Sequence, residues 1–491
     1  MLKPLAEDKW DFPAAAHLLN RAGFGGPPAE IEQLVALGPR QAVSHLLDYE
    51  QTPDPWPNPD WAQPEPQRVE RLLALRQMPP EERRKVLMEE RKKQQQYLLQ
   101  LRGWWLQRMA RGPRPFQEKM VLFWHGHFAT SFAKVGDAYL MWRQNELFRR
   151  LATGDWVQLL VEAGKDPAML VWLDQGQSRK EHPNENFTRE VMELFALGEG
   201  HYTEKDITEG ARALTGWGYD RANQKFVERP RLHDDGEKVI FGQRGHFTGE
   251  NFIGLIVQRP QAARFITAKL WQFFAGEPPS EALTTELAAL FRQSNNHFKP
   301  VLRAMFQSEA FHAPSVVRNQ VKSPVQWLVG SCRSLERNLP PIPVCVNLLR
   351  NLGQDLFAPP NVKGWDGGLA WITTNNLLNR YNQAMTLVAG DPAGMPMPNF
   401  PNRPAINRAI AERLRNAKLG AVDLDKILTE REQTDRSALL ASLERRLLQA
   451  KLTPNQERAL RNYLEAQSGL DAGDILATIR FIMCTPEFQL T

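Results

Sequence analysis

The sequence contains few of the residues that build disulfides or cysteine metal sites. Its 491 residues include three cysteines, Cys332, Cys345 and Cys484, and no two of them form a CxxC pair. We therefore expect neither a disulfide framework nor a cysteine-ligated zinc ion.

Long apolar runs are also missing. No stretch approaches the roughly 18 consecutive apolar residues that indicate a membrane-spanning helix. No uninterrupted apolar run follows Lys3, as a signal peptide would require. These absences predict a cytoplasmic protein without a membrane span.

Several common catalytic and nucleotide-binding motifs do not occur. There is no Walker loop, no Rossmann GxGxxG and no GxSxG nucleophile turn. The net charge of +5 is small for this length, and acidic residues interleave with the basic ones in the segment 83–114. We therefore do not expect a nucleic-acid partner.

Helix signals dominate what the sequence does contain. Apolar residues recur at helical spacing, with proline near expected helix starts and glycine near expected ends. In contrast, residues 217–247 have short β-prone runs between turn residues, which predict a β-hairpin or a three-stranded flap. The expected fold is mainly α: a multi-helix body with this small inserted β-hairpin or flap.

The length of the chain is too great for one hydrophobic core, and proline-rich breaks divide it. The expected parts are N-terminal helices with a Pro-rich connector (1–66), a charged helical hairpin (67–114), a helical core (115–389) that includes the flap and a Trp/Gly loop (358–372), a linker (390–404) and a C-terminal helical tail domain (405–491). One short echo links two parts, because VLRAMFQSEAF (301–311) resembles TIRFIMCTPEF (478–488). The echo predicts that two helices end in the same way.

The stretch FWHGHFATS (123–131) holds two of the ten histidines, His125 and His127. On a regular helix they would be about 200° apart, so they could not both bind one ion. Either Gly126 loosens a helix end there, or each histidine has its own partner. One could then be a ligand or base and the other a hydrogen-bonded core residue.

A polar stripe follows in ENFTREVMELFALGEG (185–200), where Asn186, Glu190 and Glu193 would share one narrow arc of a helix beside its apolar face. Two carboxylates at this spacing can share a cation, or divide into a protonated and an ionised partner. The alternative is a stripe at the solvent edge, with ion pairs to residues such as Arg189.

Three further side chains lie in predicted loops. Glycines bound the loop that carries His201, while His233 and Asp234 belong to an HDDG turn at the expected flap tip. Loop tips often carry functional groups, although aspartates in such turns also serve only to form them.

The Trp/Gly loop, APPNVKGWDGGLAWI (358–372), presents Lys363, Trp365 and Trp371 near side-chain amides. A rigid loop of this kind suits a sugar- or peptide-binding cleft. The alternative is a loop that fills the core.

Several of these motifs occur together in one known family. HLLNRAGFG, FWHGHFATS, ENFTREVMELFALGEGHYTEKDITEGARALTGW, LHDDGEKVIFG, ARFITAKLWQFF, LFAPPNVKGWDGG and the final TPEF resemble the bacterial family called domain of unknown function 1800. The resemblance runs from about His17 to the C-terminus. It implies a mainly helical protein with no established activity or cofactor, often encoded beside a sulfatase-like protein of domain of unknown function 1501.

Two hypotheses follow. The first is an enzyme that hydrolyses or modifies a polymer-derived substrate at a site between helices, assisted by a divalent metal ion. Its catalytic residues would be Glu190, Glu193, His125, His127 and Arg189; its binding residues Asn186, His201, His233, Asp234, Lys363, Trp365 and Trp371; and its metal ligands Glu190, Glu193, His127 and His201. The second is a non-enzymatic binding or maturation partner of the sulfatase-like protein.

Overall fold

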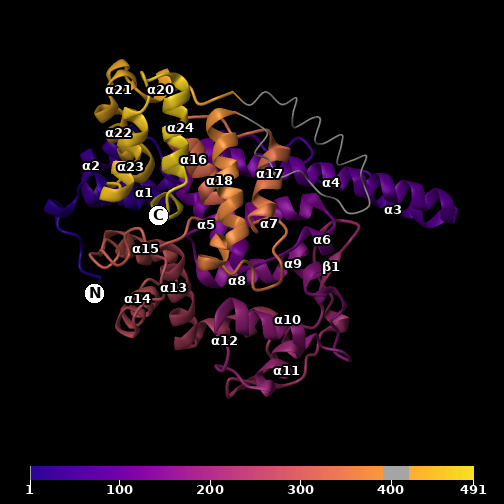
Figure 1. Cartoon of the computed structure of the whole chain (residues 1–491). Coiled ribbons are helices and arrows are strands. Elements are labelled where there is room, and N and C mark those ends of the chain that lie inside the picture. The colour runs from indigo at the N-terminus through magenta and orange to yellow at the C-terminus, as the bar shows by residue number, and fades with distance from the viewer. Residues whose placement is uncertain (1, 391–419) are drawn as a thin grey trace.

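The computed structural model describes residues 2–390 and 420–491. Helices dominate these residues, and the strands among them form two short antiparallel pairs (Figure 1). The predicted mainly α fold is therefore confirmed. The expected linker, apart from Gly390, and the first part of the expected tail domain lie outside the described residues. No described helix is long and apolar enough to cross a membrane.

The chain begins with two helices that pack on each other, α1 (Phe12–Ala22) and α2 (Pro28–Leu47). The Asp11 carboxylate accepts a hydrogen bond from the Ala14 N–H and so caps the start of α1. Gly38, with φ of 74°, bends α2. An alanine there would be strained, because this backbone conformation suits glycine.

An arm follows, made of α3 (Arg68–Gln77) and the long helix α4 (Pro80–Arg111). The charged first half of α4 is largely exposed, whereas its last turns, from Leu98 onward, enter the core. Figure 1 shows the arm extending away from the body on the right. The helix thus changes from a solvated rod into a core element along its length.

One buried ion cluster fixes the inner end of α4 to the body. The Glu118 carboxylate accepts hydrogen bonds from Arg108 and Arg149 at 2.8 Å and from the Trp105 indole at 2.9 Å. Burial alone would raise the pKa of Glu118, but Arg149 and Arg108 outweigh it and hold the pKa below its ordinary value. The carboxylate is therefore ionised, and it joins α4 to two core helices.

Nine helices between Pro115 and Gln307 contribute residues to the hydrophobic core. They are α5 (Pro115–His127), α6 (Phe132–Val135), α7 (Ala138–Arg150), α8 (Trp156–Lys165), α9 (Pro167–Trp172), α12 (Gly249–Gln258), α13 (Pro260–Ala275), α14 (Glu281–Gln293) and α15 (Phe298–Gln307). Trp124 of α5, Trp156 and Phe128 form a triangle of rings, with centroids 5.8 Å from Trp124 to each of the others and 6.2 Å between Trp156 and Phe128. These large rings fill the space between helices and explain the high tryptophan content.

The polar stretch predicted as a helix forms α10 (Glu185–Glu190), which continues directly as a π-helical segment, Val191–Ala196. After a glycine-bounded loop comes α11 (Glu204–Ala213). Thr203 and Asp206 form a reciprocal capping box at its start, so Asp206 serves the helix end.

The predicted flap is two hairpins rather than one sheet. Strand β1 (Trp217–Asp220) pairs with β2 (Lys225–Glu228), and β3 (Lys238–Ile240) pairs with β4 (Gln243–Gly245). Trp217 is buried, so the first hairpin is anchored in the core instead of standing free.

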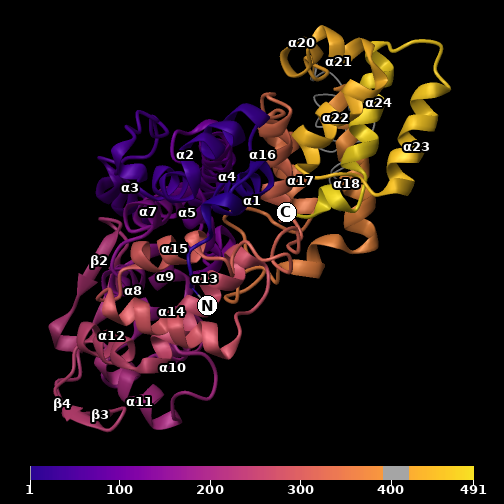
Figure 2. The same ribbon diagram turned by 90° about the vertical axis from the view of Figure 1, so that its left-hand side faces the viewer.

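The C-terminal helices gather on one side of the body (Figure 2). They comprise α16 (Pro324–Ser334), α17 (Ile342–Asn351), α18 (Thr374–Ala389), α20 (Leu424–Ile427), α21 (Glu430–Thr434), α22 (Arg436–Leu443), α23 (Pro454–Glu465) and α24 (Ala472–Met483). Hydrogen bonds from Asn20 to Gln449 and from Arg445 to Glu32 join this group to the first two helices.

The predicted echo of helix ends is confirmed. After α15, the Ser308 hydroxyl donates to the Met305 carbonyl and accepts from the Phe311 N–H. After α24, the Thr485 hydroxyl makes the same pair of bonds to Ile482 and Phe488. Each hydroxyl reinforces the turn after its helix, where the same carbonyl also accepts from a backbone N–H.

Replacing the buried carboxylate tests the ion cluster. Glu118→Gln leaves Arg108 and Arg149 beside a neutral amide, so we expect the free energy of unfolding to fall by about 3–5 kcal/mol. Urea denaturation followed by tryptophan fluorescence measures the change. Glu204→Gln, which breaks an exposed pair with Arg189, is the control and should leave stability nearly unchanged. Equal small effects from both variants would contradict a stabilising role for the cluster.

Candidate functional site

An open cleft of about 490 Å³ lies where the end of α5, helix α13, the segment before α16 and the Trp/Gly loop meet. Aromatic rings and side-chain amides dominate its lining. They belong to Phe123, Phe273, Trp365, Trp371, Gln272, Asn319, Gln320, Gln326 and Gln354. Rings beside amides suit the apolar faces and polar edges of sugars and peptides, so this cleft is the candidate site.

His125 is a buried structural residue next to the cleft. Its Nε2 accepts a hydrogen bond from the Phe357 N–H at 3.0 Å, and the ring lies among Trp105, Phe357 and Trp365. Burial, with a smaller effect of Arg102, lowers the pKa of His125 to about 3. The imidazole is therefore neutral, and it fixes the start of the Trp/Gly loop.

His127 lines the cleft itself. Its Nε2 donates to the Phe195 carbonyl at 3.0 Å, while its buried Nδ1 has no hydrogen-bond partner among the described residues. Burial and the nearby Lys269 lower the pKa of His127 well below its ordinary value, so the ring is neutral. The two histidines of the HGH motif thus have separate partners, as one of the two predicted arrangements requires.

The backbone of the Trp/Gly loop rests on the backbone between these histidines. A Cβ atom at Gly364 would lie 2.3 Å from the Gly126 carbonyl oxygen, and φ of Gly364 is 86°. Both facts require glycine at position 364. At Gly126 itself an added Cβ would meet only the Trp365 ring, at 3.9 Å.

Lys269 of α13 is the cation of the cleft wall. It donates to the Leu194 carbonyl at 3.1 Å and lies 4.6 Å from the centre of the Phe265 ring. Its ammonium has three N–H groups, and the described residues supply one acceptor and no carboxylate within ion-pair distance. Burial lowers the pKa of Lys269 to about 8.

Lys269 and His127 both contact the end of the π-helical segment, whose last carbonyls lack partners within the helix. Leu194 receives the lysine, Phe195 receives the histidine, and the Gln261 amide donates to the Leu197 carbonyl. Three side chains therefore complete this helix end. Two of them, Lys269 and His127, also face the cleft.

The predicted carboxylate stripe lies beside this helix end rather than in the cleft lining. Burial and the neighbouring Glu193 raise the pKa of Glu190, and Lys363 of the Trp/Gly loop opposes this effect. The Glu193 carboxylate accepts a hydrogen bond from the Tyr202 hydroxyl at 2.9 Å. Both glutamates are partly exposed.

Arg189, the ion-pair partner predicted for the stripe, and Asn186, its third member, lie toward the surface. Arg189 forms two hydrogen bonds to the exposed Glu204, at 2.7 and 2.9 Å, and not to Glu190 or Glu193. Asn186 is exposed. Neither residue lines the cleft.

The loop residues His201, His233 and Asp234 lie elsewhere. His201 is exposed and borders a different surface hollow beside α11. The Nδ1 of His233 is 2.9 Å from the Thr215 carbonyl. The Asp234 Oδ2 atom lies 2.7 Å from the Arg212 Nε atom. The hydrogen bond from Arg212 is the main cause that lowers the pKa of Asp234. These bonds hold the turn before β3 against α11.

The predicted metal ligands do not form one group. His127 and His201 border different cavities, and the Nε2 of His127 is engaged with a backbone carbonyl. Across residues 2–390 and 420–491, no three His, Cys, Asp or Glu side chains lie close enough to hold a metal ion together. The structure therefore does not assemble the predicted set of Glu190, Glu193, His127 and His201.

Of the residues predicted from the Trp/Gly loop, Trp365 and Trp371 line the cleft, while Lys363 lies near Glu190. Sequence reasoning missed Lys269 and the amides of Gln272, Gln320 and Gln354. A signal for Lys269 was present, because it stands between Phe265 and Phe273 on one face of a helix. The amides come from three separate segments, which only the fold brings together.

Comparison with known proteins places the chain in a family. The family model described as Protein of unknown function (DUF1800) matches residues 17–490. The chain belongs to this family. No curated protein and no solved structure matches it.

The DUF1800 match covers nearly the whole chain and confirms the resemblance found in the sequence, including its start at His17. The matched range contains every part of the cleft, from α5 through α13 to the Trp/Gly loop. The family description names no activity.

Substitution of Gly364 tests the contact that shapes the cleft. Gly364→Ala combines positive φ with a clash against the Gly126 carbonyl, so we expect unfolding free energy to fall by about 2–4 kcal/mol. Gly368→Ala is the matched control, because its φ is also positive, 53°, but no atom lies within 4 Å of the added Cβ. This control variant should lower the free energy of unfolding by about 1–2 kcal/mol. Equal losses in urea denaturation would show that the backbone contact is unimportant.

Proposed function

We propose that the chain is an enzyme that binds a polymer-derived saccharide or peptide fragment in the cleft and transfers protons with Lys269. The observation that carries this proposal is the state of Lys269. Burial brings its pKa to about 8, it has no carboxylate partner within ion-pair distance in the described part of the chain, and it faces an open cleft. A lysine of this kind exists in both protonation states near neutral pH, as a general acid or base requires.

His127 supports the same chemistry. Its neutral ring lines the cleft and completes the same helix end as Lys269, so it holds this wall without adding a second charge. Trp365 and Trp371 would bind the substrate faces, and the amides would bind its polar edges.

The lining also favours some reactions over others. Asp366 is the one carboxylate among the residues that line the cleft. The cleft lining therefore lacks the pair of carboxylates that glycoside hydrolysis usually requires. The cleft lining fits proton abstraction or addition–elimination assisted by lysine better. The proposed reaction is therefore proton transfer, a narrower class than the predicted hydrolysis or modification, and it does not use the predicted metal ligands.

The test compares two variants of the lysine. Oligosaccharides and peptides are screened for conversion by mass spectrometry, and their binding is followed by the fluorescence of the cleft tryptophans. Lys269→Arg keeps the positive charge but cannot lose its proton near neutral pH. We expect it to bind with less than about tenfold loss but to convert substrate at least about 100-fold more slowly.

The pH profile gives a second readout of the same step. If neutral Lys269 is the base, the rate rises with pH through about 8 and then levels off, because deprotonation creates the active form. A Lys269→Arg variant with unchanged rate and pH profile would rule out the assignment. Lys363→Met, outside the cleft lining, is the control and should retain activity.

A second function, docking of another protein, is favoured by the arm. Four large apolar side chains on α3 and α4 are exposed: Val69 by 43%, Leu73 by 51%, Leu87 by 43% and Met88 by 63%. Exposed apolar residues on a projecting element are typical of binding surfaces. The partner proposed for them is the sulfatase-like protein of domain of unknown function 1501, which the family resemblance suggests.

Purified partner protein tests this second function. We expect Leu73→Glu with Met88→Glu to weaken binding at least about tenfold in calorimetry, because charges replace apolar contacts. Leu378→Glu, at an exposed site on α18, is the control and should bind like the unchanged chain. No binding by the unchanged chain, or equal binding by all three proteins, would exclude the arm as the docking surface.

A further inference from the structure

The cleft continues along one face of α13. The residues of this helix that line a hollow recur at helical spacing, and they are Gln261, Arg264, Phe265, Ala268, Lys269, Gln272 and Phe273. Residues at this spacing lie on one side of a helix. Those between them, such as Ile266 and Leu270, are buried in the core. At 1.5 Å per residue the lining face is about 18 Å long, enough for several sugar units.

Two open hollows extend the cleft along this face. The first, of about 330 Å³, shares Lys269 and Gln272 with the cleft. The second, of about 610 Å³, shares Gln261 with the first. Because neighbouring hollows share side chains, the cleft and the two hollows follow one another as a single groove, which we call the α13 groove.

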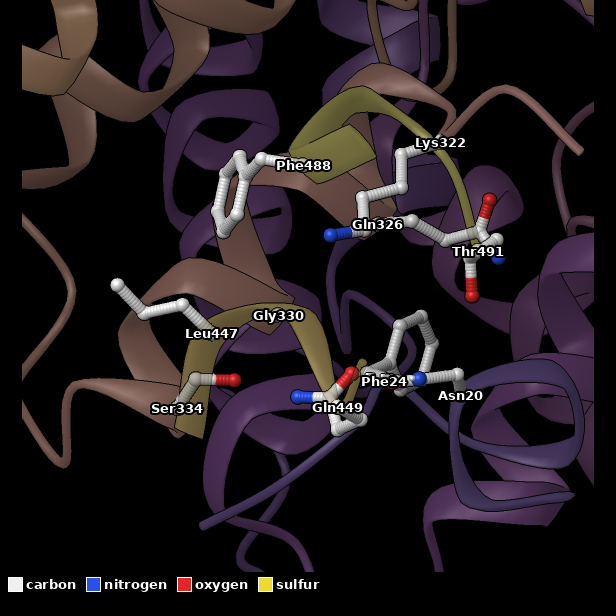
Figure 3. Close-up of a pocket in the computed structure, with 10 residues that line it drawn as sticks. All are labelled: Asn20, Phe24, Lys322, Gln326, Gly330, Ser334, Leu447, Gln449, Phe488 and Thr491. Atoms are coloured by element: carbon white, nitrogen blue, oxygen red, sulfur yellow. Dashed lines mark hydrogen bonds between the residues drawn. The ribbon is translucent and has the colours of Figure 1, made fainter. Parts of the chain in front are cut away.

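A small cavity beside α1 and α16 is different in kind (Figure 3). Its volume of about 20 Å³ holds little more than a water molecule. The polar side chains around it do not converge on one point (Figure 3). The hollows along α13, in contrast, have room for an organic ligand.

The far end of the α13 groove presents an aromatic ring on a strained turn. Phe241 and Gly242 join β3 to β4, with φ of 49° and 78°. A two-residue hairpin turn with positive φ at both positions favours Asn, Asp or Gly, so phenylalanine is unfavourable there. The Asp206 carboxylate holds the turn by accepting from the Phe241 N–H at 2.7 Å. The fold thus keeps an aromatic ring where hairpin stability alone would favour asparagine.

Arg259 gives this end of the groove a positive charge. Its guanidinium lies 5.2 Å from the centre of the Phe241 ring, and both residues line the second hollow. The described residues give Arg259 this ring contact and no carboxylate within ion-pair distance. A guanidinium on an aromatic ring keeps N–H groups available for an acid group of a ligand. His201, one of the predicted binding residues, lines the same hollow.

Cations outnumber carboxylates along the groove. The charged residues that line it are Lys205, Arg259, Arg264 and Lys269 against Asp206 and Asp366. Asp206 is engaged in the capping box of α11 and with the turn before β4. Arg264 pairs with the exposed Glu281. This leaves Lys205, Arg259 and Lys269 against Asp366, a balance that attracts an anionic ligand.

The lining favours a saccharide over a peptide. Peptides often bind by pairing with an open strand edge or by placing an apolar helix face in an apolar groove. The edge of β3 beside the groove is not open, because the Val239 and Phe241 N–H groups donate to Glu209 and Asp206. Along α13, rings such as Phe265 alternate with amides and cations rather than forming an apolar surface. Rings beside amides suit sugars, whose faces are apolar and whose edges carry hydroxyls.

We propose that the α13 groove binds an extended anionic oligosaccharide, with Lys269 at the cleft end and Arg259 and Phe241 at the far end. This inference rests on the function proposed for the cleft, because it names the substrate class of that site. Arg259 would bind an acid group and Phe241 would pack against a sugar face. Affinity should therefore increase with chain length until the chain reaches the second hollow.

Calorimetric titration with oligogalacturonates of increasing length tests the groove, and their neutral methyl esters are the matched ligands. We expect the long acids to bind at least about tenfold more tightly than the disaccharide acid and than their own esters. Sulfated oligosaccharides of equal length show whether sulfate or carboxylate is preferred, and tighter binding of either acid supports the proposal. Equal binding of acids and neutral sugars, no binding of any saccharide, or tighter binding of glutamate oligopeptides would overturn it.

Variants of the far end separate it from the cleft. Arg259→Gln with Phe241→Asn should weaken binding of the long acids at least about tenfold and leave the disaccharide unaffected. Asparagine suits positive φ, so Phe241→Asn should fold with an unchanged or higher Tm. Arg244→Gln is the control, because it removes an exposed cation of the same hairpin that does not line the groove. It should bind like the unchanged chain.

The results distinguish this inference from the function proposed for the cleft. If chain length and charge have no effect on binding while Lys269→Arg still slows conversion, the groove proposal fails and the cleft function stands. If long acids bind through Arg259 and Phe241 while Lys269→Arg converts them at an unchanged rate, the groove stands and proton transfer by Lys269 fails.

Discussion

The cleft depends on one contact between main chains, where Gly364 lies against the carbonyl of Gly126. No side chain separates the two backbone segments there, so the Trp/Gly loop can approach the end of α5 closely. His125 then reaches the Phe357 N–H, and Trp365 reaches the ring of His125. A larger residue at position 364 would move the loop and with it the two tryptophans of the cleft wall.

The same region shows how the protein places positive groups inside. Carbonyl oxygens at helix ends receive two of them. Lys269, together with the neutral His127, completes the π-helical segment, and Lys119 completes α1. Helix ends carry partial negative charge and unpaired acceptors. Glu118 is the contrast, because there a buried carboxylate joins two arginines directly.

The fold was largely predictable, since helical periodicity, capping residues and proline positions are local signals. Helix geometry also left separate partners for His125 and His127 as one of two predicted arrangements, and the structure has this one. It did not predict that Gly364 would meet Gly126, a contact between residues far apart in the chain. The carboxylate pair misled the metal prediction, because spacing places Glu190 and Glu193 together but says nothing of what faces them.

The pairing of Gln489 and Thr491 with the segment before α16 has a consequence for folding. Gln320 and Thr491 exchange two backbone hydrogen bonds, and Lys322 donates to the Gln489 carbonyl. Gln320 also lines the cleft. One wall of the cleft is therefore held by a pairing between two distant parts of the chain. Because closing such a long loop costs conformational entropy, we expect this wall to form after the local helices around it.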